Sequence, residues 1–153
     1  MREIRRSALV PATTRRMFEL INDVENYPAF VPACSAATVL ERSPAMLRAR
    51  LTVGSGAFHT SFVTRNSLTA YSSVHMELEE GPFRSLDGLW TLTPVMAPDT
   101  GQEIGSRVEL HLKFELKGGL ANLALGPVIE RMAGSLVDAF VARARQSPAP
   151  DPG

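Results

Sequence analysis

Cysteine is almost absent from this chain, because Cys34 is the only one among 153 residues. A single cysteine can form no intrachain disulfide and supplies no cysteine-based metal site. No histidine lies near it in the sequence to activate a thiol. We therefore interpret Cys34 as a small buried apolar residue.

Net charge is absent as well, since sixteen basic residues balance sixteen acidic ones. This balance favours neither a nucleic acid nor an anionic membrane as partner of the whole molecule, and we expect no DNA partner. The distribution is uneven, because residues 1–16 contain several arginines but only one acidic residue, Glu3. A solvated charged face is the simplest explanation, and an edge that faces RNA or a membrane is the alternative. These arginines are Arg2, Arg5, Arg6, Arg15 and Arg16.

Long apolar runs are missing too. The segment Met1–Val10 alternates charged and apolar residues and lacks the apolar core of about 7–15 residues that a signal peptide carries. No other stretch approaches the roughly 18 apolar residues that span a bilayer. We expect a cytoplasmic protein, with peripheral contact to the inner membrane as an alternative.

Catalytic and metal-binding motifs are also lacking. There is no His-Glu-x-x-His pair and no Gly-x-Ser-x-Gly turn, and Gly54-Ser55-Gly56 falls between two expected strands, where a turn is the better interpretation. His59, His75 and His111 lie on separate expected strands, and the last two share polar faces with glutamates. We expect no catalytic residue, no metal and no required cofactor, so the chain is predicted not to be an enzyme.

Apolar residues are plentiful, at 44% of the chain against 21% charged residues. A chain of this length forms one domain and buries roughly 70% of its unfolded surface on folding. We place that domain at residues 1–146. The remaining tail, 147–153, has no large apolar residue and is expected to be disordered.

The N-terminal region predicts one strand and two helices. Alternation predicts a strand over Arg2–Val10. Thr13 can cap a helix whose apolar residues recur every three or four positions. Asn26 can cap a short second helix with Pro28 in its first turn, and Pro32 ends it.

From Cys34 onward the apolar period changes to two. Six alternating runs with short turns between them, one turn being Asn66-Ser67, predict an antiparallel meander. With the first strand, this gives a seven-stranded sheet with one buried face. The six runs are Thr38–Glu41, Leu47–Val53, Phe58–Asn66, Val74–Glu79, Leu89–Val95 and Arg107–Leu116.

A long C-terminal helix follows Gly118-Gly119, with apolar residues at helical spacing from Leu120 to Phe140. Pro127 predicts a kink or a fresh start at Gly126-Pro127, because proline removes a helix hydrogen bond. The predicted class is α+β, with a curved sheet and the helices over one face. A cavity between sheet and helix and a solid core both fit this pattern.

Several motifs in order resemble the coenzyme Q-binding START-domain family, whose bacterial members are the RatA ribosome association toxins. The resemblance covers Ile4 to Ala144 and implies the helix-grip fold of the polyketide cyclase and START superfamily, with a hydrophobic cavity between the sheet and the long helix. The motifs are Asn26-Tyr27-Pro28-Ala29-Phe30-Val31-Pro32-Ala33-Cys34, Thr64-Arg65-Asn66, and Gly81-Pro82-Phe83 with Leu86, Gly88 and Trp90.

This resemblance implies a lipid-binding protein that holds ubiquinone or a similar isoprenoid and supports respiration. The alternative is a ribosome-associating regulator that binds the large subunit, blocks subunit association and uses the N-terminal arginines; a cyclase-type enzyme ranks third. A lipid suits an apolar cavity, since each buried methylene contributes roughly 0.8 kcal/mol. The predicted ligand-binding residues, with the short helix at the mouth, are Tyr27, Phe30, Phe62, Met76, Trp90, Leu112, Phe114, Val128, Met132 and Leu136.

Overall fold

The computed structural model describes residues 2–55 and 58–146. Its elements, in chain order, are β1 (Arg2–Val10), α1 (Thr14–Asn22), the 3-10 turn η1 (Val24–Asn26), α2 (Tyr27–Phe30), β2 (Cys34–Ser43), β3 (Met46–Ser55), β4 (Phe58–Thr69), β5 (Ser73–Glu80), β6 (Phe83–Met96), β7 (Glu103–Leu116) and α3 (Leu120–Gln146). The predicted tail, 147–153, lies outside the described residues.

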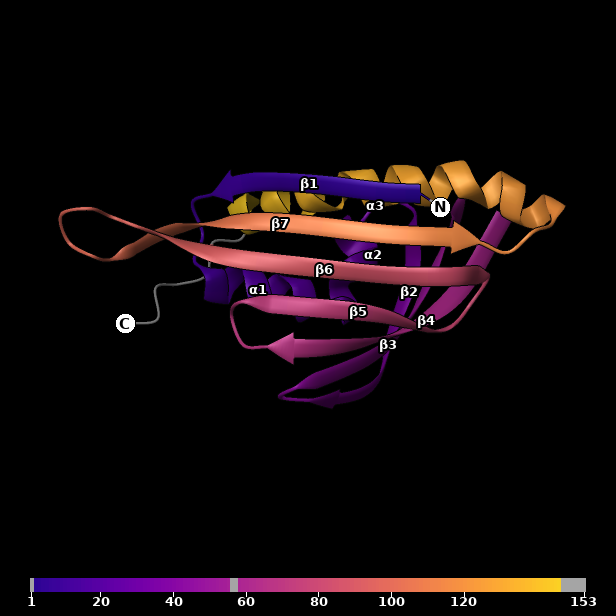
Figure 1. Cartoon of the computed structure of the whole chain (residues 1–153), viewed down its shortest axis with the longest axis horizontal. Helices are drawn as coiled ribbons and strands as arrows, with labels where there is room; N and C mark the ends of the chain where they lie inside the picture. Colours follow the sequence, from indigo (N-terminus) through magenta and orange to yellow (C-terminus); the bar gives the residue numbers. More distant parts are fainter. Residues whose placement is uncertain (1, 56–57, 147–153) are drawn as a thin grey trace.

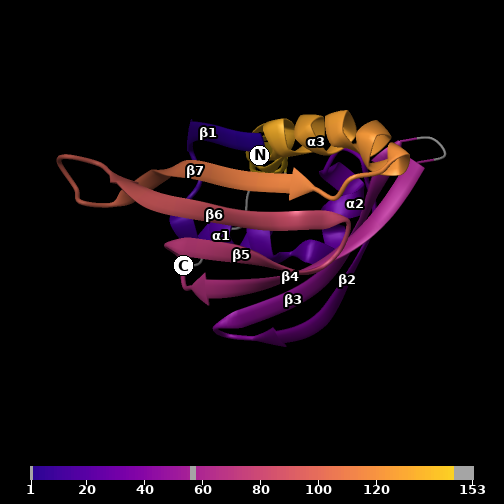
Figure 2. The same ribbon diagram turned by 45° about the vertical axis from the view of Figure 1, so that its right-hand side comes forward.

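The strands form one seven-stranded antiparallel sheet in the order β1-β7-β6-β5-β4-β3-β2. The six strands from β2 to β7 pair consecutively as a meander, and β1 forms one edge of the sheet, paired with β7. The helices all lie behind the sheet in Figure 1, and Figure 2 shows the sheet curving around them. This confirms the predicted α+β class, with a curved antiparallel sheet and a long C-terminal helix on one face.

The first helix begins where the sequence predicts. The Thr13 side chain accepts a hydrogen bond from the Arg16 backbone N–H at 3.2 Å. A carboxylate oxygen of Glu103, on β7, accepts a second from the Thr14 N–H at 2.7 Å. Both bonds satisfy N–H groups that a helix start leaves open, and the second ties α1 to the sheet.

The short helix α2 starts at the predicted place, but Asn26 does not cap it through its side chain. The Asn26 side-chain amide donates to the Asp23 carboxylate at 2.7 Å instead. The chain reaches α2 through η1, so its first N–H groups continue an existing turn. Val31 is extended before Pro32, as the residue before a proline prefers, and the helix ends there.

The predicted turn at Asn66-Ser67 is wrong, because β4 continues to Thr69. Asn66 pairs with Met76, and Ser67 with His75, in the ladder with β5. Pairing with a neighbouring strand outweighs the turn preference of these residue types.

Of the two outcomes predicted at Gly126-Pro127, a kink or a fresh start, the fresh start is wrong, since α3 is one helix from Leu120 to Gln146. Pro127 is exposed, while Leu125 and Ile129 on either side of it are buried in the core. Burial of these neighbours offsets the hydrogen bond that the proline removes. Among the residues described, no helix is long and apolar enough to cross a membrane.

A close approach between β7 and the end of β1 requires a glycine at position 105. A Cβ added to Gly105 would fall well inside contact distance of the Val10 carbonyl oxygen, a backbone atom. We expect Gly105→Ala to lower the free energy of unfolding by about 1–3 kcal/mol, because the two backbones must separate. Chemical denaturation measures this.

The matched control is Gly118→Ala, because a Cβ at Gly118 would meet nothing within 4 Å. Its free energy of unfolding should stay within about 0.5 kcal/mol of the parent. Equal effects of the two substitutions would contradict the assigned contact.

Candidate ligand cavity

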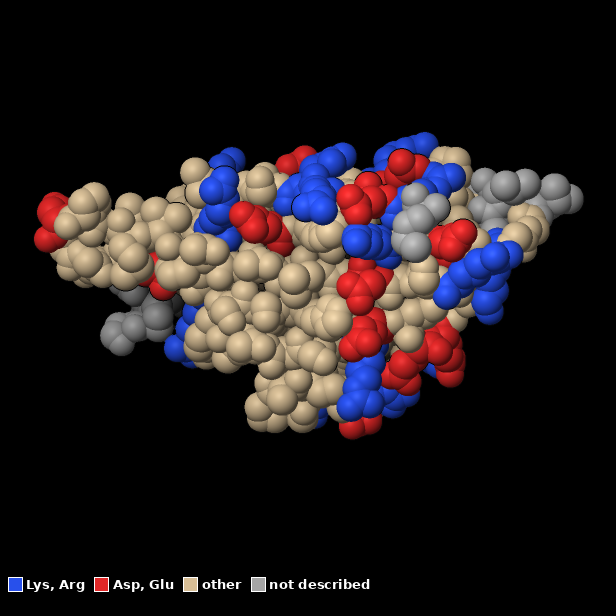
Figure 3. All heavy atoms as spheres, viewed as in Figure 1, with Lys and Arg blue, Asp and Glu red and all other residues tan. Residues whose placement is uncertain are grey.

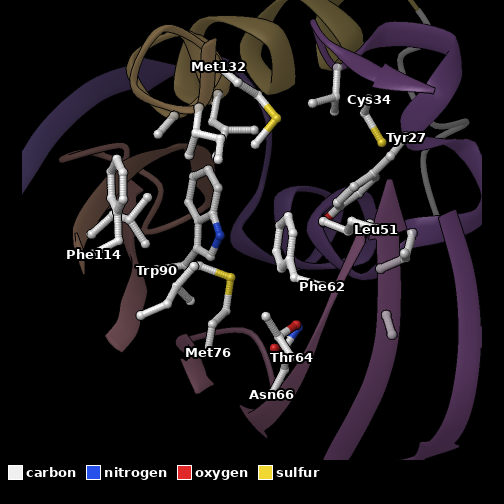
Figure 4. A pocket seen from close by; sticks show the side chains of 18 of the residues that line it. Tyr27, Cys34, Leu51, Phe62, Thr64, Asn66, Met76, Trp90, Phe114 and Met132 are labelled. Carbon is white, nitrogen blue, oxygen red and sulfur yellow. The ribbon is translucent and has the colours of Figure 1, made fainter. Parts of the chain in front are cut away.

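A cavity lies between α3 and the concave face of the sheet (Figure 4). About 70 Å³ of it is open to the centres of water molecules. At the 10–15 Å³ that one water needs on this measure, the space holds roughly five to seven waters. The lining consists of Val24, Tyr27, Val31, Cys34, Ala49, Leu51, Phe62, Thr64, Asn66, Met76, Phe83, Leu86, Trp90, Leu112, Phe114, Ile129, Met132, Ala133, Leu136 and Phe140.

The sequence periods explain how these side chains meet. On α3, Ile129, Met132, Ala133, Leu136 and Phe140 recur every three or four residues and form one helix face. On each strand every second residue points to the same side. The cavity therefore forms where the apolar stripe of one helix meets the inward face of a curved sheet.

Eight of the ten residues predicted to bind a ligand line this cavity, and Phe30 and Val128 do not. The Phe30 ring packs edge-to-face on Phe140, with the centroids 5.2 Å apart. The Arg143 guanidinium lies over the Phe30 ring, 5.1 Å from its centroid. Val128 is half-buried, and its neighbour Ile129 faces the cavity. Ligand binding by the eight stays a prediction.

Two polar residues, Thr64 and Asn66, also line the cavity. The ten predicted ligand-binding residues omit both, although Asn66, at the end of a predicted strand, fits either a turn or a hydrogen-bond donor to a ligand headgroup. Both follow Phe62 at intervals of two along β4, so all three point to the same side of the strand. The alternation could have identified them. The predicted strand Phe58–Asn66 contains both residues, and the turn predicted at Asn66-Ser67 gave Asn66 a competing role.

Two polar side chains of the lining already have partners. The Tyr27 hydroxyl donates to the Ile21 carbonyl oxygen, and burial raises the pKa of Tyr27. The Cys34 thiol lies 3.5 Å from the Ala36 carbonyl oxygen, and burial raises its pKa as well. Both groups stay neutral at physiological pH, and Cys34 is buried and free, as predicted.

Asn66 differs, because its side chain is only 7% exposed and its Oδ1 has no hydrogen-bond partner among the described residues. Thr64, two residues earlier, is equally buried. A buried polar group without a partner destabilises a protein by about 1–3 kcal/mol. Such groups are rare and call for an explanation.

The histidines of β5 and β7 lie on the outer face of the sheet, away from the cavity. His75 Nε2 is 2.9 Å from an Asp87 carboxylate oxygen, and His111 Nε2 is 3.3 Å from Glu3. Over residues 2–55 and 58–146, no group of three or more His, Cys, Asp or Glu side chains could hold a metal ion.

A row of charged side chains crosses the outer face from one edge of the sheet to the other. Cross-strand neighbours in the row are Glu3, Lys113, Asp87, Glu77, Arg65, Arg48 and Glu41. Figure 3 shows a mixed band of red and blue spheres on this face. The sheet thus has one apolar and one charged face, as the alternation along β7 predicts.

Arg48, a member of this row, donates two parallel hydrogen bonds of 2.6 and 3.0 Å to the carboxylate of Glu79. The bonds from Arg48 lower the pKa of Glu79 below its ordinary value of 4.5. A carboxyl with a lowered folded pKa stabilises the fold above its unfolded pKa, and that contribution disappears as the pH falls through the folded pKa. NMR titration of the Glu79 side chain should therefore give a midpoint below 4.5.

Arg48→Gln should move this midpoint upward, toward the ordinary value, because Arg48 is the largest cause of the lowered pKa and Arg65 a smaller one. Arg107→Gln is the control, because Arg107 pairs with Glu109 on another part of the sheet. An unshifted midpoint in the parent protein would contradict the pairing.

The N-terminal arginines lie on two different elements, β1 and α1. Arg5 lies on β1, 71% exposed and 3.5 Å from Glu3, and Arg6, also on β1, lies beside Gly134 of α3. Arg15 lies on α1, paired with Glu19 at 3.0 Å and above the Tyr71 ring at 5.7 Å. The structure thus separates a β1 pair, Arg5 and Arg6, from an α1 pair, Arg15 and Arg16.

A curved antiparallel sheet that holds one long helix over an apolar cavity defines a START-like, helix-grip protein. The model of the family described as polyketide cyclase / dehydrase and lipid transport matches residues 10–141, and the chain belongs to this family. The predicted family resemblance is confirmed.

Two relatives illustrate the range of names in this family. The chain is 43% identical to the ribosome association toxin RatA of Pseudomonas aeruginosa, over 94% of this chain and 95% of that protein. It is 27% identical to the mitochondrial coenzyme Q-binding protein COQ10 homolog B of Xenopus laevis, over 85% of this chain and 54% of that protein. The similarity to the toxin is therefore both stronger and more complete.

Solved structures agree on the fold. A START superfamily protein from Mycobacterium smegmatis superimposes with a TM-score of 0.72 at 20% identity, over 94% of this chain and 97% of that chain. An aromatase/cyclase from Streptomyces sp. R1128 gives 0.72 at 18% identity, over 99% and 98%. At these identities the likeness defines the fold and leaves the activity open.

Proposed function

We propose that this protein is a ribosome-associating regulator that binds the large ribosomal subunit. The supporting observation is the 43% identity to a ribosome association toxin over nearly the whole of both chains. The sequence analysis held this function as its alternative to lipid binding. The comparisons favour it over the main prediction, because the coenzyme Q-binding relative is more distant.

Surface charge is compatible with this proposal. The chain is neutral overall, so attraction to RNA must come from a local group of cations. The β1 pair provides two exposed cations on an edge strand of the sheet, Arg5 on the outer face beside Glu3 and Arg6 on the side of α3. Cations on an exposed edge can reach phosphates without rearrangement of the fold.

Co-sedimentation with purified ribosomal subunits tests the proposal. The protein should sediment with large subunits at low salt and be released as the salt concentration rises, because phosphate contacts weaken steeply with salt. Small subunits and a charge-matched unrelated protein are the controls. Absence of the protein from the large-subunit fraction at every salt concentration would contradict the proposal.

We propose as a second function that the cavity binds a hydrophobic molecule, ubiquinone or a similar isoprenoid lipid. The supporting observation is the mostly apolar lining between α3 and the sheet. The ligand-free space of about 70 Å³ is too small for a quinone ring with an isoprenoid tail. Binding must therefore widen the cavity, and we expect α3 to move away from the sheet.

Trp90 reports on this second function, because it is the only tryptophan of the chain and lines the cavity. Added ubiquinone should quench its fluorescence with saturation, and organic extraction of the purified protein should release a lipid detectable by mass spectrometry. Both functions are binding functions, so we propose that the protein is not an enzyme. No extracted lipid and no saturable quenching would contradict ligand binding.

A further inference from the structure

Two polar side chains lie close together in the mostly apolar lining of the cavity. Thr64 and Asn66, from β4, lie opposite Met132 of α3, and Figure 4 shows their oxygen and nitrogen atoms below the cavity. Phe62 and Met76 flank them. Of the described lining residues, only Asn66 has a buried side-chain atom, Oδ1, without a hydrogen-bond partner.

The neighbourhood explains why Asn66 lacks a partner. Met76, which pairs with Asn66 across the β4–β5 ladder, has no donor to offer. The Tyr27 hydroxyl is occupied by the Ile21 carbonyl, and the Cys34 thiol lies against the Ala36 carbonyl. A donor for Asn66 Oδ1 must therefore come from the cavity itself.

We propose that Thr64 and Asn66 form a subsite for the uncharged hydroxyl headgroup of an apolar ligand. A hydroxyl can donate to Asn66 Oδ1 and accept from the Asn66 amide or the Thr64 hydroxyl. A carbonyl can only accept, so it leaves Oδ1 without a donor. This inference rests on the second function proposed above and narrows its ligand class to an alcohol, phenol or quinol with an apolar body. The reduced form, ubiquinol, therefore fits the subsite better than ubiquinone does.

The subsite excludes charged headgroups. No Lys, Arg, Asp or Glu belongs to the described lining. A carboxylate or phosphate placed there would lose its hydration without gaining a counter-charge, which is strongly unfavourable. Fatty acids and phospholipids are therefore outside the ligand class.

Three probes with the same six-carbon chain separate these possibilities: 1-hexanol, n-hexane and hexanoate. Isothermal titration calorimetry gives their affinities, with Trp90 fluorescence as a second measurement. Asn66→Leu should lower the ratio of hexanol to hexane affinity about tenfold, because one buried hydrogen bond is lost. Thr64→Val should act in the same direction, and hexanoate should bind more weakly than hexanol to the parent protein.

Thr52→Val is the matched control, because it makes the same substitution as Thr64→Val at a residue outside the cavity lining, where the Thr52 hydroxyl lies 2.8 Å from Ser61 Oγ. Its affinity ratio should equal that of the parent. A ratio unchanged by both Asn66→Leu and Thr64→Val would overturn the subsite, as would tighter binding of hexanoate than of hexanol. Binding of none of the probes would overturn the ligand-binding function as well, whereas hexane binding with no preference would overturn the subsite alone.

Discussion

Replacing Phe140 with alanine is expected to lower the free energy of unfolding by about 3–5 kcal/mol. Phe140 is 1% exposed and lies on the face of α3 that lines the cavity. Its ring packs edge-to-face on Tyr27, Phe30 and Trp90, with centroid separations of 5.4, 5.2 and 5.3 Å. Each such pair adds about 0.5–1.5 kcal/mol to the energy of burial.

This effect is large because Phe140 joins three parts of the fold: α3, α2 and the sheet through β6. A domain of this size has a total stability of about 5–15 kcal/mol, so the variant should approach the unfolding threshold. Chemical denaturation followed by far-ultraviolet circular dichroism measures the change.

Phe18→Ala is the control for the same change of side chain. Phe18 is half-buried on α1 and has one aromatic neighbour, Tyr71, at 5.5 Å. We expect it to lose less than half as much stability, since less apolar surface becomes exposed. Equal losses of unfolding free energy in the two variants would contradict the role of Phe140 in joining α3, α2 and the sheet.

Charge reversal of the β1 pair is the second prediction, and its expected effect is on ribosome association. Arg5→Glu with Arg6→Glu should weaken co-sedimentation with large subunits by about 10–100-fold at low salt and reduce the salt dependence. The reason is exposure, because Arg5 is 71% exposed with one long ion pair to Glu3. Surface pairs of this kind hold a side chain only weakly.

The α1 pair provides the matched control, with the same change in net charge. Arg15 is held by Glu19 and lies over Tyr71, so we expect Arg15→Glu with Arg16→Glu to change sedimentation less. A larger effect of the α1 pair would move the contact surface to α1. Unchanged sedimentation in both variants would remove these arginines from the ribosome contact, and thermal melts confirm that each variant is folded.

Most of the secondary structure could be predicted from the sequence, because its signals are local. The even positions of β7, from Val108 to Leu116, predict a strand with one buried face, and the Thr13 cap predicts the start of α1. Both predictions are confirmed. The residue patterns behind both predictions lie within a few positions of each other along the chain.

Two of the errors occurred where remote segments outweigh local preference. Asn66-Ser67 has turn-forming residues, but pairing with β5 extends the strand through them. Pro127 disfavours a helix interior, but buried residues on both sides keep α3 continuous. In both cases the segment that decides the structure, β5 for Asn66-Ser67 and the core around Leu125 and Ile129 for Pro127, includes residues that are distant in the sequence.

The sequence by itself determined the elements, their order and which residues face inward, because side-chain direction follows the local periods of two and 3.6. Only the tertiary structure decided which inward residues share a cavity, how small the cavity is, and that Asn66 reaches it without a partner. It also separated the β1 pair from the α1 pair. These properties depend on sheet curvature and on packing between distant segments, which no local pattern of residues specifies.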